Sequence, residues 1–207
     1  MEVYIILKSI DTKEKILITA SKLFQKQGYH ATGLNQIIKE SGCPKGSLYY
    51  YFPDGKEQLV EEAVFRATED MRQEVDNLLS AHDNVIDAID HLFNFHEEID
   101  VKAEYDGIPL ALIAMETALM SERIRIACRN SYTLLISMWA DKFVASNWPR
   151  QAAVEISTLI FAIIQGNGIV AMTQLSNEPF KLAHKQVMEI IRNKEKELDL
   201  DGPTVTN

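Results

Sequence analysis

Apolar residues recur at the three-to-four-residue spacing of an amphipathic helix along most of the chain, and strict strand-like alternation is absent. In the first such segment, residues 11–28, the lysines lie away from the apolar stripe. That stripe consists of Ile16, Leu17, Ala20, Leu23 and Phe24. Gly28 stands where such a helix commonly ends. The pattern predicts a helix that buries one face and exposes a basic one.

Two short helices joined by a tight turn are expected next. The first lies within TGLNQIIKESG, with Thr32 as its N-cap and Gly42 as its end. The second lies within PKGSLYYYF and opens at Pro44, because the missing N–H of proline is no loss at a helix start. Leu48 and Phe52, four residues apart, form the face expected to pack on the preceding helices.

Longer helical patterns fill the rest of the chain. They cover about residues 56–80, 83–99, 108–119, 121–146, 150–175 and 179–197, with proline-containing breaks between several of them. The sequence therefore predicts an all-α fold. We expect a three-helix N-terminal domain with its leading arm in residues 1–56, a larger helical bundle in residues 57–197, and a polar flexible tail in residues 198–207.

Composition limits the class of protein. With 46% hydrophobic residues, the 207-residue chain can bury a sizeable core. No apolar run reaches the roughly 18 residues that a membrane span requires, and the N-terminus does not resemble a secretory signal. Cys43 and Cys128 are too few for a disulfide framework or a thiolate zinc site. We expect a cytoplasmic protein that acts without membrane, metal or cofactor.

Charge is distributed unevenly. Residues 1–56 contain eight lysines and five acidic residues, a net charge of +3, so the remaining residues account for −12 within a total of −9. A basic end on an acidic body hints at a polyanion partner. By charge alone, a chance excess of lysine on solvated helix faces is equally acceptable.

The two short helices form a predicted helix-turn-helix, in which the second helix enters the major groove of DNA. Leu48 and Phe52 would hold that helix in place, so its other face is free for phosphates and base edges. There Lys45 can reach a phosphate, and Gly46 lets the backbone approach closely. The tyrosine hydroxyls of the YYY run suit phosphate or base contacts, although packing within the domain is the alternative for each, most of all for Tyr51.

Residues Lys15 to Gln58 resemble the tetracycline-repressor (TetR) family of bacterial transcription factors. The resemblance rests on KILITASKLFQKQGY, on TGLNQIIKESG, and on PKGSLYYYFP followed by GKEQL. It implies double-stranded operator DNA as a partner. The DNA-facing positions that it implies are Asn35, Gln36, Lys45, Gly46, Ser47, Tyr49, Tyr50, Tyr51 and Lys56. Many members have arginine where Asn35 stands, and asparagine prefers adenine to guanine, so the preferred operator would differ.

The body resembles a narrower subgroup, the repressors of lincomycin-resistance-type operons. The matching stretches are GIPLAL at 107–112, ETA at 116–118, and shorter matches at 121–122 and 127–128. This resemblance implies a small-molecule effector pocket within residues 57–146 and a homodimer interface near the C-terminus. The nearly all-apolar segment EISTLIFAIIQGNGIVAMTQ is compatible with that interface, but a helix buried within one chain is the alternative.

Apolar and aromatic side chains suggest the effector pocket, with His96 and Gln165 as polar anchors. The candidate contacts are Met71, Phe93, His96, Met115, Trp139, Phe143, Phe161 and Gln165. They suit an apolar or aromatic ligand, although core packing is the alternative for each aromatic residue. A ligand beside Met71 would tilt the helix that begins at Lys56 and so release the DNA.

Two other functions stay open from the residues alone. An all-helical enzyme is one, because histidines and carboxylates gather between His91 and Asp100. The metalloprotease pattern HExxH is absent, however, and His91 and His96 point to different helix faces. A DNA-binding protein without effector control is the other. The large body, with no role in that case, argues against it.

Overall fold

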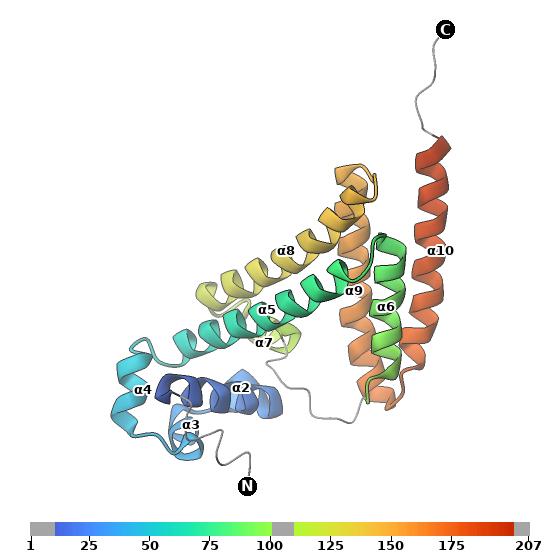
Figure 1. Ribbon diagram of the computed structural model, residues 1–207. Helices are drawn as coiled ribbons and strands as arrows, with labels where there is room; N and C mark the ends of the chain where they lie inside the picture. The colour runs from blue at the N-terminus through green and yellow to red at the C-terminus, as the bar shows by residue number, and fades with distance from the viewer. Residues whose placement is uncertain (1–10, 101–109, 201–207) are drawn as a thin grey trace. The chain divides into compact units, whose positions relative to one another are not determined.

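The computed structural model describes residues 11–100 and 110–200, and within these ranges it contains nine α-helices and no β-strand (Figure 1). The helices are α2 (Thr12–Ala31), α3 (Leu34–Ser41), α4 (Lys45–Tyr51), α5 (Lys56–Ser80), α6 (Val85–Glu98), α7 (Leu110–Thr117), α8 (Glu122–Ala145), α9 (Arg150–Gln174) and α10 (Glu178–Leu200). The predicted all-α fold is confirmed, and each predicted helix is found within a few residues of its expected limits. The N-terminal arm, the break before α7 and the end of the predicted tail lie outside the described residues.

The end of α2 differs from the prediction. Gly28 does not end the helix but forms a kink inside it, with φ 79° and ψ 176°, and α2 continues to Ala31. Thr32 is not the N-cap of α3, because Gly33 occupies that position. The Thr32 hydroxyl instead donates a hydrogen bond of 2.7 Å to the carbonyl oxygen of Gly28. The kink therefore uses the side chain that sequence reasoning assigned to the next helix.

One compact unit combines the described residues up to Met71 with those from Leu110 to Tyr132. Its core unites α2, α3, α4, α7 and the first halves of α5 and α8. The fully buried large side chains of this core are Ile16, Phe24, Ile37, Leu48, Phe52, Leu59, Ile113 and Ile124. The predicted packing face of α4, formed by Leu48 and Phe52, is thereby confirmed.

Polar side chains add directional links within this unit. Arg123 of α8 donates to Asp54 (2.8 Å) in the turn before α5 and to Glu61 (2.6 Å) on α5. Thr68 and Ser131 share a buried hydrogen bond of 2.6 Å between α5 and α8. An ion pair near the surface contributes at most about 1 kcal/mol, so the Arg123 links orient the helices more than they stabilise them.

The second unit contains residues 72–100 together with residue 133 onward. Here α10 packs against both α6 and α9. The large buried side chains of its core include Phe93, Trp139, Phe143, Trp148 and Ile191. Asn177, between α9 and α10, donates from its amide nitrogen to the carbonyl oxygens of Glu97 (2.8 Å) and Ile99 (2.6 Å). This bond pair ties the α9–α10 turn to the end of α6.

A histidine clasp joins α6 to α10 in the same unit. The ring of His184 lies parallel to that of Phe93, with centroids 5.1 Å apart. Its Nδ1 lies 2.7 Å from Glu97 and its Nε2 lies 3.1 Å from Asp90. The α6–α10 packing thus combines apolar burial with polar contacts between the His184 ring and two carboxylates.

Candidate nucleic-acid interface

The turn between α3 and α4 is set by one glycine and one proline. Gly42 ends α3 in the left-handed region, with φ 64°, which costs glycine little. Pro44 is the N-cap of α4, with φ −57° and ψ 140°. The sequence predicted Pro44 as the first helical residue, so the helix begins one position later than predicted, at Lys45. The turn is short, so α4 starts directly beside the end of α3, as in the predicted helix-turn-helix.

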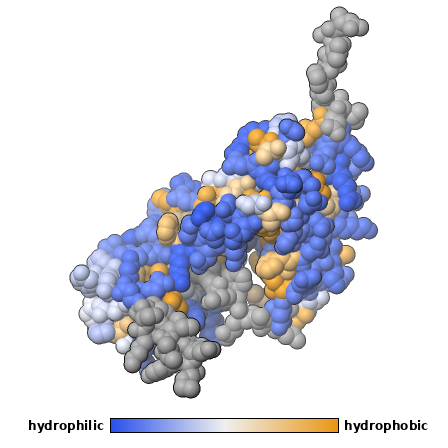
Figure 2. Space-filling view, in the orientation of Figure 1, coloured by the Kyte–Doolittle hydropathy of each residue, from blue (hydrophilic) through white to orange (hydrophobic). Residues whose placement is uncertain are grey.

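The outward face of α4 is the candidate DNA surface. Lys45 and Gly46 are exposed, and Tyr49 and Tyr50 are 44% and 78% exposed. Figure 2 shows pale, weakly polar atoms gathered over this end of the first unit, on an otherwise largely hydrophilic surface. Two large aromatic side chains held in solvent beside a lysine match the predicted rim. Their contact with DNA stays a prediction.

The remaining predicted positions of α4 are less open. Ser47 and Tyr51 are half-buried. Tyr51 packs against the core of the first unit, and its ring meets that of Tyr50 edge to face at 4.9 Å. Tyr51 therefore supports the orientation of its neighbour, which is the packing alternative considered for it from the sequence.

The two predicted positions on α3 have different surroundings. Asn35 is exposed. The amide oxygen of Gln36 accepts a bond of 2.9 Å from Gln27 of α2, and its nitrogen donates to Glu40 at 2.9 Å. Gln36 thus joins α2 to α3, and any base contact by its side chain would compete with these bonds.

Lys56, the last predicted DNA contact, begins α5 and is half-buried. Its ammonium nitrogen lies 4.0 Å from the centre of the Tyr29 ring, a close cation–π contact. Burial lowers the pKa of Lys56, and the nearby negative charge of Glu116 opposes that change. Burial also raises the pKa of Tyr29, as does the charge of Glu57. Lys56 is therefore a positioned cation rather than a freely moving one.

Sequence reasoning missed two residues at this end of the molecule, Tyr29 and Glu116. Glu116 of α7 accepts a hydrogen bond from the backbone N–H of Tyr29, across 87 positions of sequence. The available signal was the ETA stretch at 116–118, which was used for the subgroup resemblance but given no role.

The predicted effector residues do not form one set. Phe93, Trp139 and Phe143 share the buried core of the second unit, while His96 stacks on Phe180 with ring centroids 4.9 Å apart. The remaining members are Phe161 and Gln165, half-buried on α9, Met71, which packs against the core of the first unit, and Met115, 78% exposed on α7. Three of the aromatic residues thus fill a core, and an effector contact by any of the eight stays a prediction.

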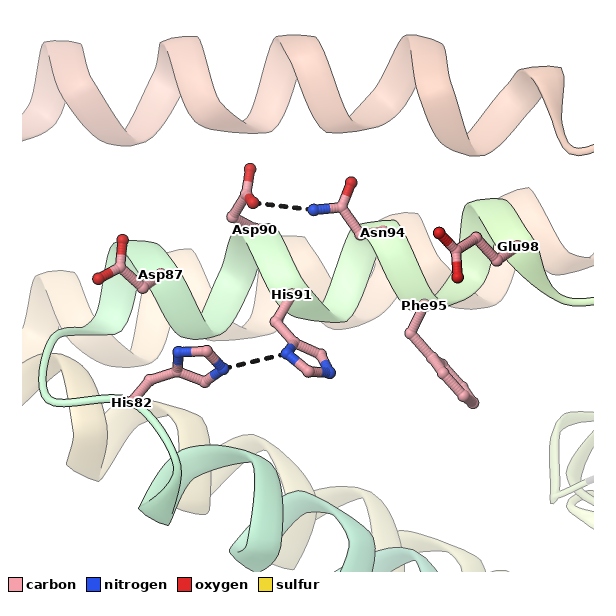
Figure 3. Close-up of a pocket in the computed structure, with 7 residues that line it drawn as sticks. All are labelled: His82, Asp87, Asp90, His91, Asn94, Phe95 and Glu98. Atoms are coloured by element: carbon pink, nitrogen blue, oxygen red, sulfur yellow. Dashed lines mark hydrogen bonds between the residues drawn. The ribbon is translucent and has the colours of Figure 1, made fainter.

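An open pocket of about 480 Å³ lies along the outer side of α6 and the turn before it (Figure 3). It is lined by His82, Asp87, Asp90, His91, Asn94, Phe95 and Glu98. Within it Nε2 of His82 and Nδ1 of His91 are 3.1 Å apart and hydrogen-bonded. This polar lining does not suit the apolar ligand predicted from the sequence, and it includes none of the predicted effector residues.

A second open groove, of about 540 Å³, runs between α9 and α10. Its lining is mostly apolar and includes Ile163, Val170 and Leu182. A side chain placed at Gly166 or Gly168 would meet nothing within 4 Å, so nothing in the described chain requires these glycines. Mid-helix glycine costs about 1 kcal/mol relative to alanine. The groove is thus a mostly apolar surface that contains Gly166, a glycine with no packing role among the described residues.

By length and composition alone, α9 is apolar enough to cross a membrane, with a mean hydropathy of 1.6 over 18 residues. Polar residues are scattered along this helix, so it contains no uninterrupted apolar run long enough to indicate a membrane span from the sequence. Ala153, Ile156 and Ile160 of α9 nevertheless belong to the core of the second unit. A core helix with a second apolar face also meets this criterion of length and composition.

Cys128 lacks the properties of a reactive thiol. Burial raises the pKa of Cys128 to about 11, so its thiol stays protonated at neutral pH. Among the described residues, no group of three or more histidine, cysteine, aspartate or glutamate side chains is arranged to hold a metal ion.

Two family models match the chain. Residues 16–63 match the model of bacterial regulatory proteins of the tetR family, and residues 85–186 match the C-terminal domain of LmrA/YxaF-like transcriptional regulators. The first match contains α3, α4 and the start of α5, and the second begins with α6.

Curated and solved proteins agree with these matches. The chain is 39% identical to the HTH-type transcriptional regulator YxaF of Bacillus subtilis, over 89% of this chain and 97% of that protein. It is 41% identical to the HTH-type transcriptional regulator LmrA of the same organism, over 82% and 90% of the two chains. Reduced NemR of E. coli has the same fold, with a TM-score of 0.73 and 24% identity over 86% of this chain and 95% of that one.

His96 of α6 yields a prediction about how stability depends on pH. Burial lowers the pKa of His96 to about 4 from an ordinary 6.5, so the unfolded chain binds a proton that the folded chain excludes. Stability is therefore lost as the pH falls through 6.5, by about 2 kcal/mol between pH 7 and pH 5. Chemical denaturation at both pH values should show that His96→Phe, which can still stack on Phe180, loses less stability than the wild type.

Leu119→Phe is the control, because it introduces the same phenylalanine at a fully exposed position and removes no titratable group. This variant should lose as much stability between pH 7 and pH 5 as the wild type does. Equal losses in the wild type and His96→Phe would contradict the prediction.

Proposed function

The chain belongs to the TetR family of bacterial transcriptional regulators, with an LmrA/YxaF-like C-terminal domain, and from this premise we propose that it is an effector-released repressor. Regulation of transcription through helix-turn-helix DNA binding is the function of the family. Repression, a homodimer and release by a small apolar or aromatic molecule are the proposed additions. Its relatives are named as bacterial transcriptional regulators, so we assign it regulation rather than catalysis and place it in the cytoplasm, where bacterial DNA lies.

The observation that best supports operator binding is the orientation of α4. Leu48 and Phe52 are fully buried on one side, and Tyr49 and Tyr50 stand in solvent on the other. We assign residues 1–56 to DNA binding, residues 57–197 to the effector and the dimer, and residues 198–207 to a tail. The structure includes the first residues of that proposed tail in α10, which runs to Leu200.

The apolar surface of α9 and α10 supports the homodimer. Ile169 is 54% exposed, and Leu159, Val170, Met172, Leu182 and Ile190 are exposed as well. Exposed apolar side chains gathered on two adjacent helices commonly mark an interface. A second copy related by two-fold symmetry would cover the groove and approach the bare glycines 166 and 168 closely. A homodimer would present two α4 helices, and the two half-sites that such dimers bind lie about one DNA turn, or 34 Å, apart.

The first prediction from the proposed function concerns DNA binding. Lys56→Ala should weaken every site alike and reduce the salt slope of binding by about one unit, because it removes one phosphate contact. Tyr50→Ala should instead change the preference among operator sequences. Fluorescence anisotropy at several salt concentrations, on the segment that footprinting identifies next to the chain's own gene, measures both effects.

Lys185→Ala is the control, because it removes the same charge from an exposed position of α10. It should bind as the wild type does. If Lys56→Ala and Tyr50→Ala both left the footprint and the salt slope unchanged, the DNA-contact assignment would be wrong.

The second prediction concerns assembly. Ile169→Glu should give monomers in sedimentation velocity, because it buries an unpaired charge in the proposed interface. Ile164 is a poorer choice, since it packs against the core of its own unit. Asn130→Glu adds the same charge to an exposed position of α8 and should stay dimeric. A monomeric wild type at micromolar concentration would contradict the proposal.

The third prediction concerns release. Thermal-shift screening of aromatic and amphipathic compounds should identify a ligand that stabilises the protein. Operator DNA should then weaken binding of that ligand by the same factor by which the ligand weakens DNA binding, roughly 5–150-fold. Isothermal titration with and without operator DNA measures this factor. Equal ligand affinity in the two titrations would favour the alternative of a DNA-binding protein without effector control.

A further inference from the structure

A contact between α7 and the end of α2 links a carboxylate to the proposed DNA surface. We propose that Glu116 is a positioning residue for DNA binding: it holds the kinked end of α2 and, through Tyr29, fixes the ammonium group of Lys56. The inference rests on the proposed phosphate contact of Lys56 and adds a residue that touches no DNA itself.

The first step is the fit of the carboxylate against Gly28. A side chain at Gly28 would begin 2.5 Å from Oε1 and 3.0 Å from Oε2 of Glu116. The carboxylate therefore occupies the space that the glycine leaves open. The backbone of Gly28, at φ 79° and ψ 176°, has a conformation that is essentially restricted to glycine. Shape and backbone conformation thus both require glycine opposite Glu116.

The second step is hydrogen bonding at the kink. The kink interrupts the helical ladder, and buried backbone groups need other partners there. The N–H of Tyr29 donates to Oε2 of Glu116, and the carbonyl oxygen of Gly28 accepts from Thr32. His30 adds a second link to α7, because its Nε2 lies 3.3 Å from the backbone carbonyl oxygen of Glu116. The last turn of α2 is thus held by the C-terminal end of α7.

The third step leads from Tyr29 to Lys56. The Tyr29 ring is bounded by Phe24 at 6.3 Å and, edge to face, by His30 at 5.2 Å. Lys56 lies over this ring, 4.0 Å from its centre. A shift of the Tyr29 backbone would therefore move the surface on which the ammonium group rests. Lys56 directly follows the turn after α4, so its position fixes where a phosphate can bind relative to Tyr49 and Tyr50.

If Glu116 acts by positioning, its loss should weaken DNA binding, whereas if it acts through its charge alone, its loss should strengthen DNA binding. A carboxylate near DNA repels phosphates, so loss of its charge alone would strengthen binding. Loss of the acceptor would instead free the kink and weaken binding. Glu116→Gln keeps an amide oxygen that can accept from Tyr29, whereas Glu116→Ala keeps neither acceptor nor charge.

The experiment measures dissociation constants on the footprinted operator and on a non-specific duplex at low salt, with circular dichroism to verify folding. Glu116→Ala should weaken operator binding about tenfold, while Glu116→Gln stays within about threefold of the wild type. Glu122→Ala is the matched control. It removes the same charge from the exposed start of α8 and should bind like the wild type. If Glu116→Ala does not fold, Glu116→Asp replaces it, because the shorter side chain also withdraws the acceptor.

A double-mutant cycle tests the path through Lys56. In a Lys56→Ala background, Glu116→Ala should cost less than about twofold, because the cation that it positions is gone. The proposal would be wrong if Glu116→Ala reduced operator affinity as much in the Lys56→Ala background as in the wild type. It would also be wrong if Glu116→Ala bound the operator as tightly as the wild type or more tightly, or if Glu116→Gln weakened binding as much as Glu116→Ala. A wild-type chain that binds no operator would count against the proposed function instead, and the non-specific duplex would still test the role of Glu116.

Discussion

The seven-residue helix α4 has no means of holding itself in place, and the DNA-facing end of the molecule depends on how it is anchored. An isolated helix of this length is unstable in water, because too few hydrogen bonds repay the cost of nucleation. Leu48 and Phe52 supply the missing stabilisation by full burial among residues of α2, α3 and α5. Fully burying each such side chain contributes about 1.5–3 kcal/mol. The exposed tyrosines have a defined direction only because their two neighbours are buried.

The same unit is completed by residues far along the chain. α7 and the start of α8 belong to the matched C-terminal family domain, yet Ile113 and Ile124 lie in one core with the helix-turn-helix. Glu116 and Arg123 add polar links to α2 and to the start of α5. The unit that presents α4 therefore contains more than the three helices predicted within residues 1–56, and α7 contacts the end of α2 directly.

In the second unit, α9 has apolar side chains that the described residues leave exposed. α9 contributes Ala153, Ile156 and Ile160 to its own core, while Leu159, Ile169 and Val170 remain exposed. The bare glycines 166 and 168 lie along the same helix. The proposed second copy of the chain would account for both observations, because close helix approach requires small residues and buries the exposed ones.

Periodicity alone determined the helices, the buried stripe of α2 and the packing face of α4, because local hydrophobic spacing decides which face of a helix is buried. The ordered motifs around α3 and α4 were enough to indicate the family. Periodicity could not separate core aromatic residues from ligand contacts: Phe93, Trp139 and Phe143 were predicted as effector contacts, and they pack in a core, so their contact with an effector stays a prediction. Nor could it find the kink at Gly28, which a C-cap rule placed at a helix end. The carboxylate of Glu116, nearly ninety positions away, contacts that kink, and a pairing over such a distance exists only once the chain has folded.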